Sequence, residues 1–175
     1  MKKRRLGLSD LYVSEIGLGT MSFRSKSDTE RLIHYAIDHG VNFIDTADLY
    51  RYGEIETWIG QALKGIRDQV ILATKVGNHW EKGKEGWFWD PSKKYIQRAV
   101  KDSLTRLKTD YIDLYQLHGG TIDDPIDETI EAFEELKKEG IIRYYGISSI
   151  RPNVIKEYVK RSKMVSVMMP YSLLD

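Results

Sequence analysis

Short apolar segments alternate along the chain with longer stretches in which hydrophobic residues recur at helical spacing. The apolar segments are Ile16–Leu18, Val41–Ile44, Val70–Val76, Tyr111–Leu117, Tyr144–Ile147 and Val165–Met169. The third is almost continuously hydrophobic, which is typical of a strand covered on both faces. Strands and helices that alternate through short turns indicate parallel βαβ units. The pattern therefore predicts about six βα units in a single domain that spans residues 1–175.

The helical stretches have recognisable start and stop signals. Ser27-x-x-Glu30 has the form of a capping box, and Gly40 ends that helix. Further helices are predicted over Glu54–Leu63, from Pro91-Ser92 through Leu104, from Pro125 to Gly140, and from Pro152, which suits a first helical position. Before all of these, Leu6 and Tyr12–Val13 flank a Gly7-Leu8-Ser9-Asp10 turn, which predicts a short N-terminal hairpin.

Polar residues follow the predicted strands where those strands end. They are Asp45 with Tyr50, Lys75, His118 and Ser148-Ser149. A βα-barrel builds its active site from residues at the carboxyl ends of its strands. A doubly wound open sheet is the rival architecture, but no G-x-G-x-x-G motif follows the first strand. We therefore expect an α/β fold of the (β/α)8 TIM-barrel type, of which about six units are present.

Composition narrows the class of protein. Lys and Arg number 27 against 26 Asp and Glu, and the one basic run, Lys2 to Arg5, suits the solvated edge of a hairpin. No nucleic-acid partner is predicted. The absence of cysteine removes disulfides and thiol chemistry, and no apolar run approaches the length that spans a bilayer. We expect no membrane partner and a cytoplasmic location.

Asp45, Tyr50, Lys75 and His118 form a chemically coherent set. A phenol is a poor proton donor at neutral pH, and a nearby lysine ammonium makes its proton easier to release. An aspartate would keep that lysine charged and oriented, and a histidine could hydrogen-bond a substrate oxygen. None of these residues is a strong nucleophile, so the set favours proton delivery to an oxygen during a reduction. The hydride must then come from a cofactor.

Each residue also has a plainer interpretation. Asp45 could cap a turn, Tyr50 could pack beside Tyr52, and His118 could be a structural histidine. Lys75 is harder to explain in this way, because a lysine at the end of an apolar strand needs a counter-charge or a function. His118 and Asp45 lack a convincing third ligand, so no metal site is predicted. The other histidines, His34, His39 and His79, are assigned no role.

Two long segments resemble the signatures of the aldo-keto reductase family. The first is Gly40-Val-Asn-Phe-Ile-Asp-Thr-Ala-Asp-Leu-Tyr50, followed by Gly53-Glu54 and Gly60, and the second runs from Ser103 to His118. Similarity extends through Ile147-Ser148-Ser149 to Tyr171-Ser172-Leu173-Leu174 and so covers almost the whole chain. The resemblance implies an (α/β)8 barrel that binds NADPH at its C-terminal mouth and reduces aldehydes or ketones to alcohols.

The resemblance also implies roles for individual residues. Tyr50 would be the general acid, Lys75 and Asp45 would tune it, and His118 would orient the carbonyl group of a small-molecule substrate. Gly19, Thr20 and Met21 would lie against the nicotinamide side of the cofactor. Ser148 and Ser149 would hold the carboxamide, although many family members have Asn in place of Ser149 and Gln in place of Met168.

The family's seventh and eighth strands carry further cofactor contacts, and no counterparts follow Asp175. A six-stranded piece would leave its first and sixth strands as open edges, which we expect to favour pairing with another chain. Two alternatives to a reductase therefore stay open. One is a truncated or assembly-dependent fragment without activity, and the other is a regulatory subunit that binds the cofactor with little turnover.

The segment from Asn78 to Asp90 is rich in aromatic residues. It contains Trp80, Trp87, Phe88 and Trp89 and follows the strand of Lys75. One interpretation makes these rings a wall of the substrate pocket. The alternative is a loop that packs on itself over the barrel mouth. Their position at the catalytic face favours the pocket wall.

Overall fold

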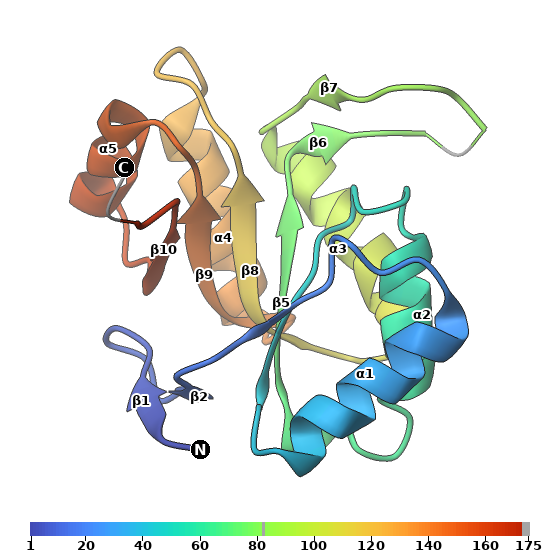
Figure 1. The fold of residues 1–175 in the computed structure, drawn as a ribbon. Helices are drawn as coiled ribbons and strands as arrows, with labels where there is room; N and C mark the ends of the chain where they lie inside the picture. The colour runs from blue at the N-terminus through green and yellow to red at the C-terminus, as the bar shows by residue number, and fades with distance from the viewer. Residues whose placement is uncertain (82, 173–175) are drawn as a thin grey trace.

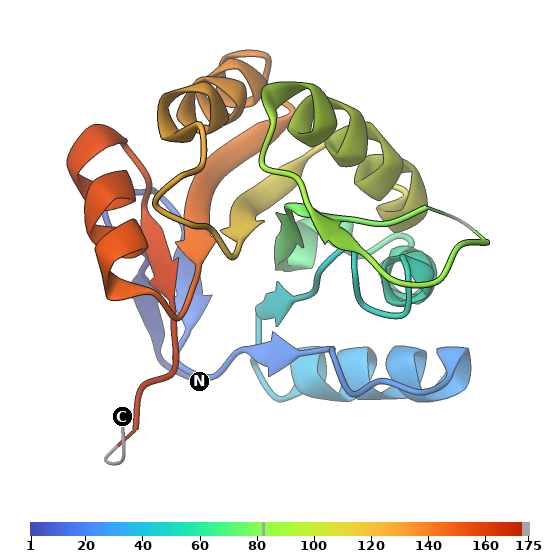
Figure 2. The ribbon, with the colours of Figure 1, turned by 90° about the horizontal axis from the view of Figure 1, so that it is seen from above.

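A curved parallel sheet forms the centre of the structure. The computed structural model describes residues 1–81 and 83–172, and its six parallel strands lie in the spatial order β10-β9-β8-β5-β4-β3. The strands are β3 (Leu18–Gly19), β4 (Phe43–Asp45), β5 (Ile71–Val76), β8 (Ile112–His118), β9 (Ile142–Ser148) and β10 (Ser166–Met168). Figure 2 shows this sheet curving with the helices along its outer face. This is an incomplete (β/α)8 barrel, as the sequence predicts.

The helices follow the strands and bury the outer face of the sheet. They are α1 (Lys26–Asp38), α2 (Glu54–Ala62), α3 (Lys93–Leu107), α4 (Ile126–Lys138) and α5 (Pro152–Arg161), with a 3-10 turn η1 (Arg67–Gln69) before β5. Strand side chains such as Leu72, Leu117 and Ile147 pack against helix side chains such as Ile59 and Ile96 in one apolar core. Burial of this apolar area is the main stabilising term of the fold. No helix in the described part of the chain is long and apolar enough to cross a membrane.

The helix starts confirm some sequence signals and correct one. Ser92 accepts a hydrogen bond from the Tyr95 amide and caps α3, and Pro152 occupies the first turn of α5. The N-cap of α1 is Ser25, whose hydroxyl accepts from the Asp28 amide, so the prediction of Ser27 as the cap is wrong. Ser25 lies two residues earlier, in extended backbone, and Ser27 is already inside the helix.

Two strand predictions are corrected at their edges. The first strand is Leu18–Gly19 instead of Ile16–Leu18, because only these two residues pair with β4 and Ile16 is exposed. The fifth begins at Ile142, two residues before the predicted start at Tyr144, because Ile142 pairs with Ile112. Pairing partners distant in sequence fix these boundaries, and local hydrophobicity does not reveal them.

Two antiparallel hairpins flank the sheet. The predicted N-terminal hairpin pairs β1 (Lys3–Arg5) with β2 (Tyr12–Ser14), and its basic strand is exposed. The second, β6 (Asn78–His79) with β7 (Phe88–Trp89), lies within the aromatic segment and was not predicted from sequence. Figure 1 shows the first near the amino ends of the parallel strands and the second near their carboxyl ends.

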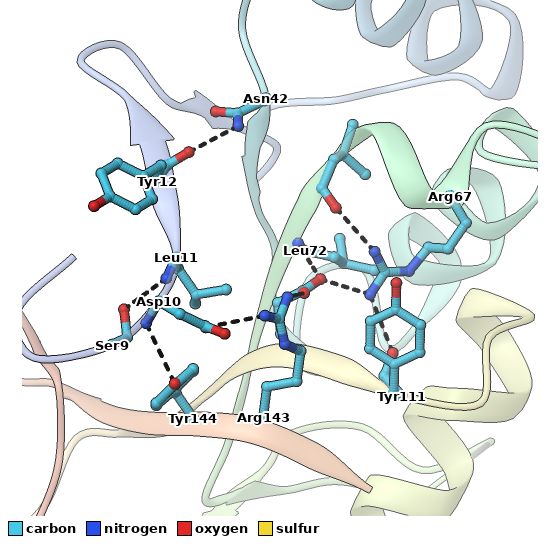
Figure 3. A network of polar contacts seen from close by, with 12 residues as sticks. Ser9, Asp10, Leu11, Tyr12, Asn42, Arg67, Leu72, Tyr111, Arg143 and Tyr144 are labelled. Atoms are coloured by element: carbon cyan, nitrogen blue, oxygen red, sulfur yellow. Dashed lines mark hydrogen bonds and ion pairs between the residues drawn. The ribbon is translucent and has the colours of Figure 1, made fainter. Parts of the chain in front are cut away.

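A polar network fastens the N-terminal hairpin to the sheet. Arg143 of β9 reaches Asp10 of the hairpin turn at 3.0 Å and Asp113 of β8 at 2.8 Å. Asp113 also accepts hydrogen bonds from Arg67 at 2.8 Å and from the Leu72 amide at 3.0 Å. Figure 3 shows this chain of contacts, which joins segments far apart in the sequence. Asp113 is almost fully buried, and a buried carboxylate needs hydrogen-bond donors or positive charges beside it. The network supplies these partners.

Candidate active site

The predicted tetrad comes from three neighbouring strands. Asp45 ends β4, Lys75 lies near the end of β5, and His118 ends β8, while Tyr50 lies in the turn that follows β4. The register places Lys75 beside Gln116 on β8 and Asp45 beside Ala73 on β5. Side chains alternate between the faces of a sheet, so Asp45, Lys75 and Gln116 all lie on its concave face. The structure thus brings together four residues that span 74 positions of sequence, from 45 to 118.

Lys75 is the centre of the polar contacts. Its Nζ lies 2.6 Å from Asp45 Oδ2, 2.8 Å from the Thr46 carbonyl oxygen and 3.3 Å from Tyr50 Oη. The Lys75 side chain is almost fully buried. A buried ammonium is tolerated only when it is paired and hydrogen-bonded, and these three contacts use its three donors. Lys75 is therefore held with its charge against the phenol oxygen.

Burial sets the electrostatics of Asp45. It raises the pKa of Asp45 above the ordinary value, and the adjacent Lys75 ammonium and the Gln116 amide oppose that rise. Gln116 Nε2 donates to Asp45 Oδ1 at 3.4 Å, so both carboxylate oxygens have a partner. An aspartate with both oxygens engaged is fixed in orientation and in turn fixes Lys75.

His118 is a neutral imidazole over most of the pH range. Burial, with a smaller effect from the Lys75 charge, lowers its pKa to about 4. Its ring stands edge-on to Tyr50, with ring centroids 6.0 Å apart. The buried Nδ1 has no hydrogen-bond partner in the described part of the chain. A neutral ring beside an ammonium avoids a second buried positive charge and still offers a hydrogen bond to a bound oxygen.

A pocket opens in front of Tyr50, Lys75 and His118. Its volume is about 420 Å³, and its other walls are Gly119, Ser148, Ser149, Ile150, Arg151, Met168, Met169 and Pro170. A pocket of this size suits a small organic molecule. The two serines predicted to bind the cofactor therefore share one cavity with the predicted acid. Of the two, Ser149 is partly committed already, because its hydroxyl accepts a hydrogen bond from the Arg151 amide at 3.2 Å.

The three residues predicted at the end of the first strand lie in different environments. A Cβ added at Gly19 would meet no atom within 4 Å, so there is open space on that side of the strand. Thr20 is buried, and both its amide and its hydroxyl donate to the Asp45 carbonyl oxygen, at 3.1 and 3.0 Å. Met21 is largely exposed. Of the three, Gly19 has the free space that a bound group needs, whereas Thr20 fastens β3 to β4.

The aromatic segment lies elsewhere than predicted. None of its described residues lines the pocket of Tyr50 and His118. Trp80 packs edge-on against Tyr52, and the Arg106 guanidinium lies over its ring. Trp87 and Phe88 are exposed. The Trp89 indole donates a hydrogen bond to Asp124 at 2.9 Å. The hairpin β6–β7 directs these rings toward α2, α3 and the loop after β8. Two described residues of the segment touch the pocket lining: Trp89 lies against Gly119, and Asn78 Nδ2 donates to the His118 carbonyl oxygen at 3.3 Å.

Gln116 is a site residue to which sequence reasoning gave no role. It lies within the second signature, two positions before His118, and period-two alternation puts both on one face of β8. That spacing is a signal that could have identified it. The Thr46 carbonyl had no such signal, because any residue carries that acceptor.

The comparisons with known proteins identify the family. The model of the aldo/keto reductase family matches residues 15–175. This chain belongs to the aldo/keto reductase family. The family is a class of oxidoreductases, and the tetrad described above lies within the matched region.

Two bacterial proteins with similar sequences agree with this assignment. An uncharacterised oxidoreductase, YqkF, of Bacillus subtilis (strain 168) is 65% identical over 176 residues, which cover 100% of this chain and 58% of that protein. An NADH-specific methylglyoxal reductase of Escherichia coli (strain K12) is 36% identical over 198 residues, covering 100% of the chain and 60% of that protein. The chain therefore spans about three-fifths of the length of these relatives.

A solved structure matches the fold closely. The holo form of an aldo-keto reductase from Bacillus halodurans is 69% identical, with a TM-score of 0.98. The match covers 100% of this chain and 59% of that protein. The curved arrangement of the described strands and helices is thus also found in this longer member of the family.

Proposed function

We propose that the site reduces the carbonyl group of a small aldehyde or ketone to an alcohol, with Tyr50 as the proton donor. The observation that carries this proposal is the 3.3 Å contact between Lys75 Nζ and Tyr50 Oη, inside a pocket that also contains His118. A buried ammonium beside the phenol oxygen stabilises the phenolate that remains after proton transfer. Reduction of a carbonyl group develops negative charge on oxygen, which is where this proton is needed.

The other tetrad residues support that proton transfer. Asp45 balances the charge of Lys75 and holds it in place through the 2.6 Å ion pair. His118 stays neutral at physiological pH and offers its ring to the substrate oxygen, which orients the carbonyl group toward Tyr50. A positioned pair of hydrogen-bonding groups at a developing oxyanion lowers the barrier of the chemical step.

We further propose NADPH as the cofactor, which would supply the hydride when bound. The residues present fit the nicotinamide end of NADPH. The open space at Gly19 and the serines of the pocket lie on the same carboxyl-terminal side of the sheet. Ser148 would contact the carboxamide, and Gly19 would allow close approach of the ring. The name of the Escherichia coli relative specifies NADH, so the choice between the two nucleotides is part of the test.

The decisive experiment compares the chain with its Tyr50→Phe variant. NADPH and NADH are titrated into both proteins by cofactor fluorescence, and carbonyl-dependent nucleotide oxidation is then followed with methylglyoxal and an aromatic aldehyde. The variant removes only the phenolic hydroxyl, so we expect unchanged nucleotide affinity and a loss of turnover of about 10²-fold or more. Equal turnover by the variant would contradict the role of Tyr50. A folded chain that binds nucleotide without any turnover would instead support a cofactor-binding subunit.

A further inference from the structure

A second cleft lies between α2 and α3, apart from the pocket of Tyr50. Its volume is about 680 Å³, and it shares no lining residue with that pocket. Three aromatic side chains, Tyr52, Trp80 and Tyr95, form part of its walls. Figure 1 shows the two helices side by side. Gly60 permits their close approach, because a Cβ at this position would lie only 2.5 Å from the Arg106 carbonyl oxygen.

Asp48 lies in the wall of this cleft and has an unused hydrogen-bonding atom. Its side chain is 1% exposed, and its Oδ1 has no hydrogen-bond partner among residues 1–81 and 83–172. Its backbone amide donates to the Lys75 carbonyl oxygen at 3.3 Å, which fixes the turn against β5. An unpartnered buried carboxylate oxygen is costly, so its retention calls for an explanation.

The charges around Asp48 do not balance. Glu56 is fully buried, and its two oxygens bind Arg106 at 2.7 Å and Thr74 at 2.6 Å. Arg106 is thus committed to Glu56, and Asp48 is left as a second buried carboxylate without a cation of its own. Burial, followed by the charge of Glu56, raises the pKa of Asp48 well above the ordinary value, against the opposing effects of Arg106, the Leu49 amide and Tyr95. Among the described residues, the charge of Asp48 is therefore opposed only in part, by Arg106, which pairs with Glu56.

We propose that the cleft between α2 and α3 is a second ligand site, which binds a small organic ammonium ion on Asp48. The ammonium group would supply the missing cation and a donor for Oδ1. The aromatic walls of Tyr52, Trp80 and Tyr95 would cover its carbon skeleton, and rings also attract cations through their faces. Asp102 adds a further carboxylate to the lining, whereas Arg98 is directed to His79 Nε2 at 2.8 Å.

The first test is calorimetric titration of benzylamine into the 175-residue chain at neutral pH, in two buffers with different ionisation enthalpies. We expect saturable binding, and the two buffers measure any proton that leaves Asp48 as the ammonium binds. Benzyl alcohol has the same shape without the charge and should not bind. The absence of saturable benzylamine binding, or equal binding of the alcohol, would overturn the proposal.

Matched variants locate the binding site. Asp48→Asn keeps the shape of the side chain without its charge, and we expect it to weaken benzylamine binding about tenfold or more. Tyr50→Phe changes the other pocket and should leave benzylamine affinity unchanged. Full affinity in Asp48→Asn, or a loss confined to Tyr50→Phe, would overturn the proposal. If Asp48→Asn does not fold, benzylamine affinity is measured in Trp80→Ala instead. Unchanged affinity in Trp80→Ala would also overturn the proposal.

Discussion

At the residue scale, one buried ion pair organises the candidate active site. The Lys75–Asp45 pair is nearly inaccessible to solvent and lies in the concave face of the sheet. Such a pair adds little net stability, because desolvation of both charges offsets their attraction. It does fix geometry, since each group would be left unpaired if the other moved. This pair is therefore better explained by the proposed role of Tyr50 than by stability.

The low pKa of His118 predicts a pH dependence of stability. The ordinary pKa is 6.5 and the folded value is about 4, so the unfolded chain binds a proton in this range that the folded chain does not. The stability contributed by keeping His118 neutral is complete above pH 6.5 and is lost as the pH falls toward 4. The loss amounts to roughly 3 kcal/mol over that window.

Urea unfolding at several pH values measures this contribution. We expect the unfolding free energy of the chain to fall more steeply between pH 6.5 and 4 than that of His118→Gln, which cannot take up the proton. His39→Gln is a suitable control, because His39 is exposed and hydrogen-bonded to its own helix. Parallel pH curves for the chain and His118→Gln would show that His118 is not responsible.

At the element scale, the start of α1 shows how a sequence signal can shift by a few residues. Ser27-x-x-Glu30 and Ser25-x-x-Asp28 both fit the capping pattern, and the structure uses the second. The chain reaches extended backbone at Ser25, and only there can a side chain accept from the amide three residues ahead. Thr29 adds a second tie, because its hydroxyl donates to the Ser25 carbonyl oxygen at 2.8 Å.

These two serines offer a matched pair of substitutions. Ser25→Ala removes the cap and should lower the free energy of unfolding by about 1 kcal/mol. Ser27→Ala leaves the cap in place and should change it by less than about 0.5 kcal/mol. Both values come from urea denaturation followed by circular dichroism. A larger loss in Ser27→Ala would contradict the assignment of the cap.

At the scale of the whole molecule, the N-terminal hairpin is joined to the sheet by the network in Figure 3. Arg143 links Asp10 of the hairpin to Asp113 of the sheet, and the Asp10 amide donates to Tyr144 Oη at 3.3 Å. The two contacts of Asp10 connect residues more than 130 positions apart in sequence. They form only when the sheet has assembled, so the hairpin is held in place only in the folded chain.

Loss of Arg143 should loosen the hairpin. We expect Arg143→Met to destabilise the chain by about 1–2 kcal/mol, because Asp113 loses one of its charged partners while it stays buried. Arg4→Met removes an exposed ion pair with Glu15 and should cost no more than about 0.5 kcal/mol. Hydrogen exchange at the Leu6 amide, which bonds to the Leu11 carbonyl, should accelerate in the first variant only. Equal exchange rates in both variants would contradict the conclusion that Arg143 anchors the hairpin to the sheet.

The order of strands and helices, and the four polar residues at the strand ends, could be read from the sequence. Hydrophobic periodicity and glycine and proline positions are local signals, and parallel strands bring their carboxyl ends to one edge. The predicted proximity of Lys75 to Asp45 and Tyr50 follows from that topology, and the structure confirms it. Their catalytic roles remain predictions.

Only the tertiary structure decided the strand edges, the course of the aromatic segment and the cluster around Asp48. Strand ends depend on partners such as Ile112 for Ile142, which periodicity within one segment does not reveal. Trp80 lies against α3 instead of the pocket of Tyr50, because the β6–β7 pairing sets its direction. The commitment of Arg106 to Glu56, which leaves Asp48 without a cation, joins residues 50 positions apart. Burial and charge balance at such sites are properties of packing between distant segments, and so they appear only when the chain is folded.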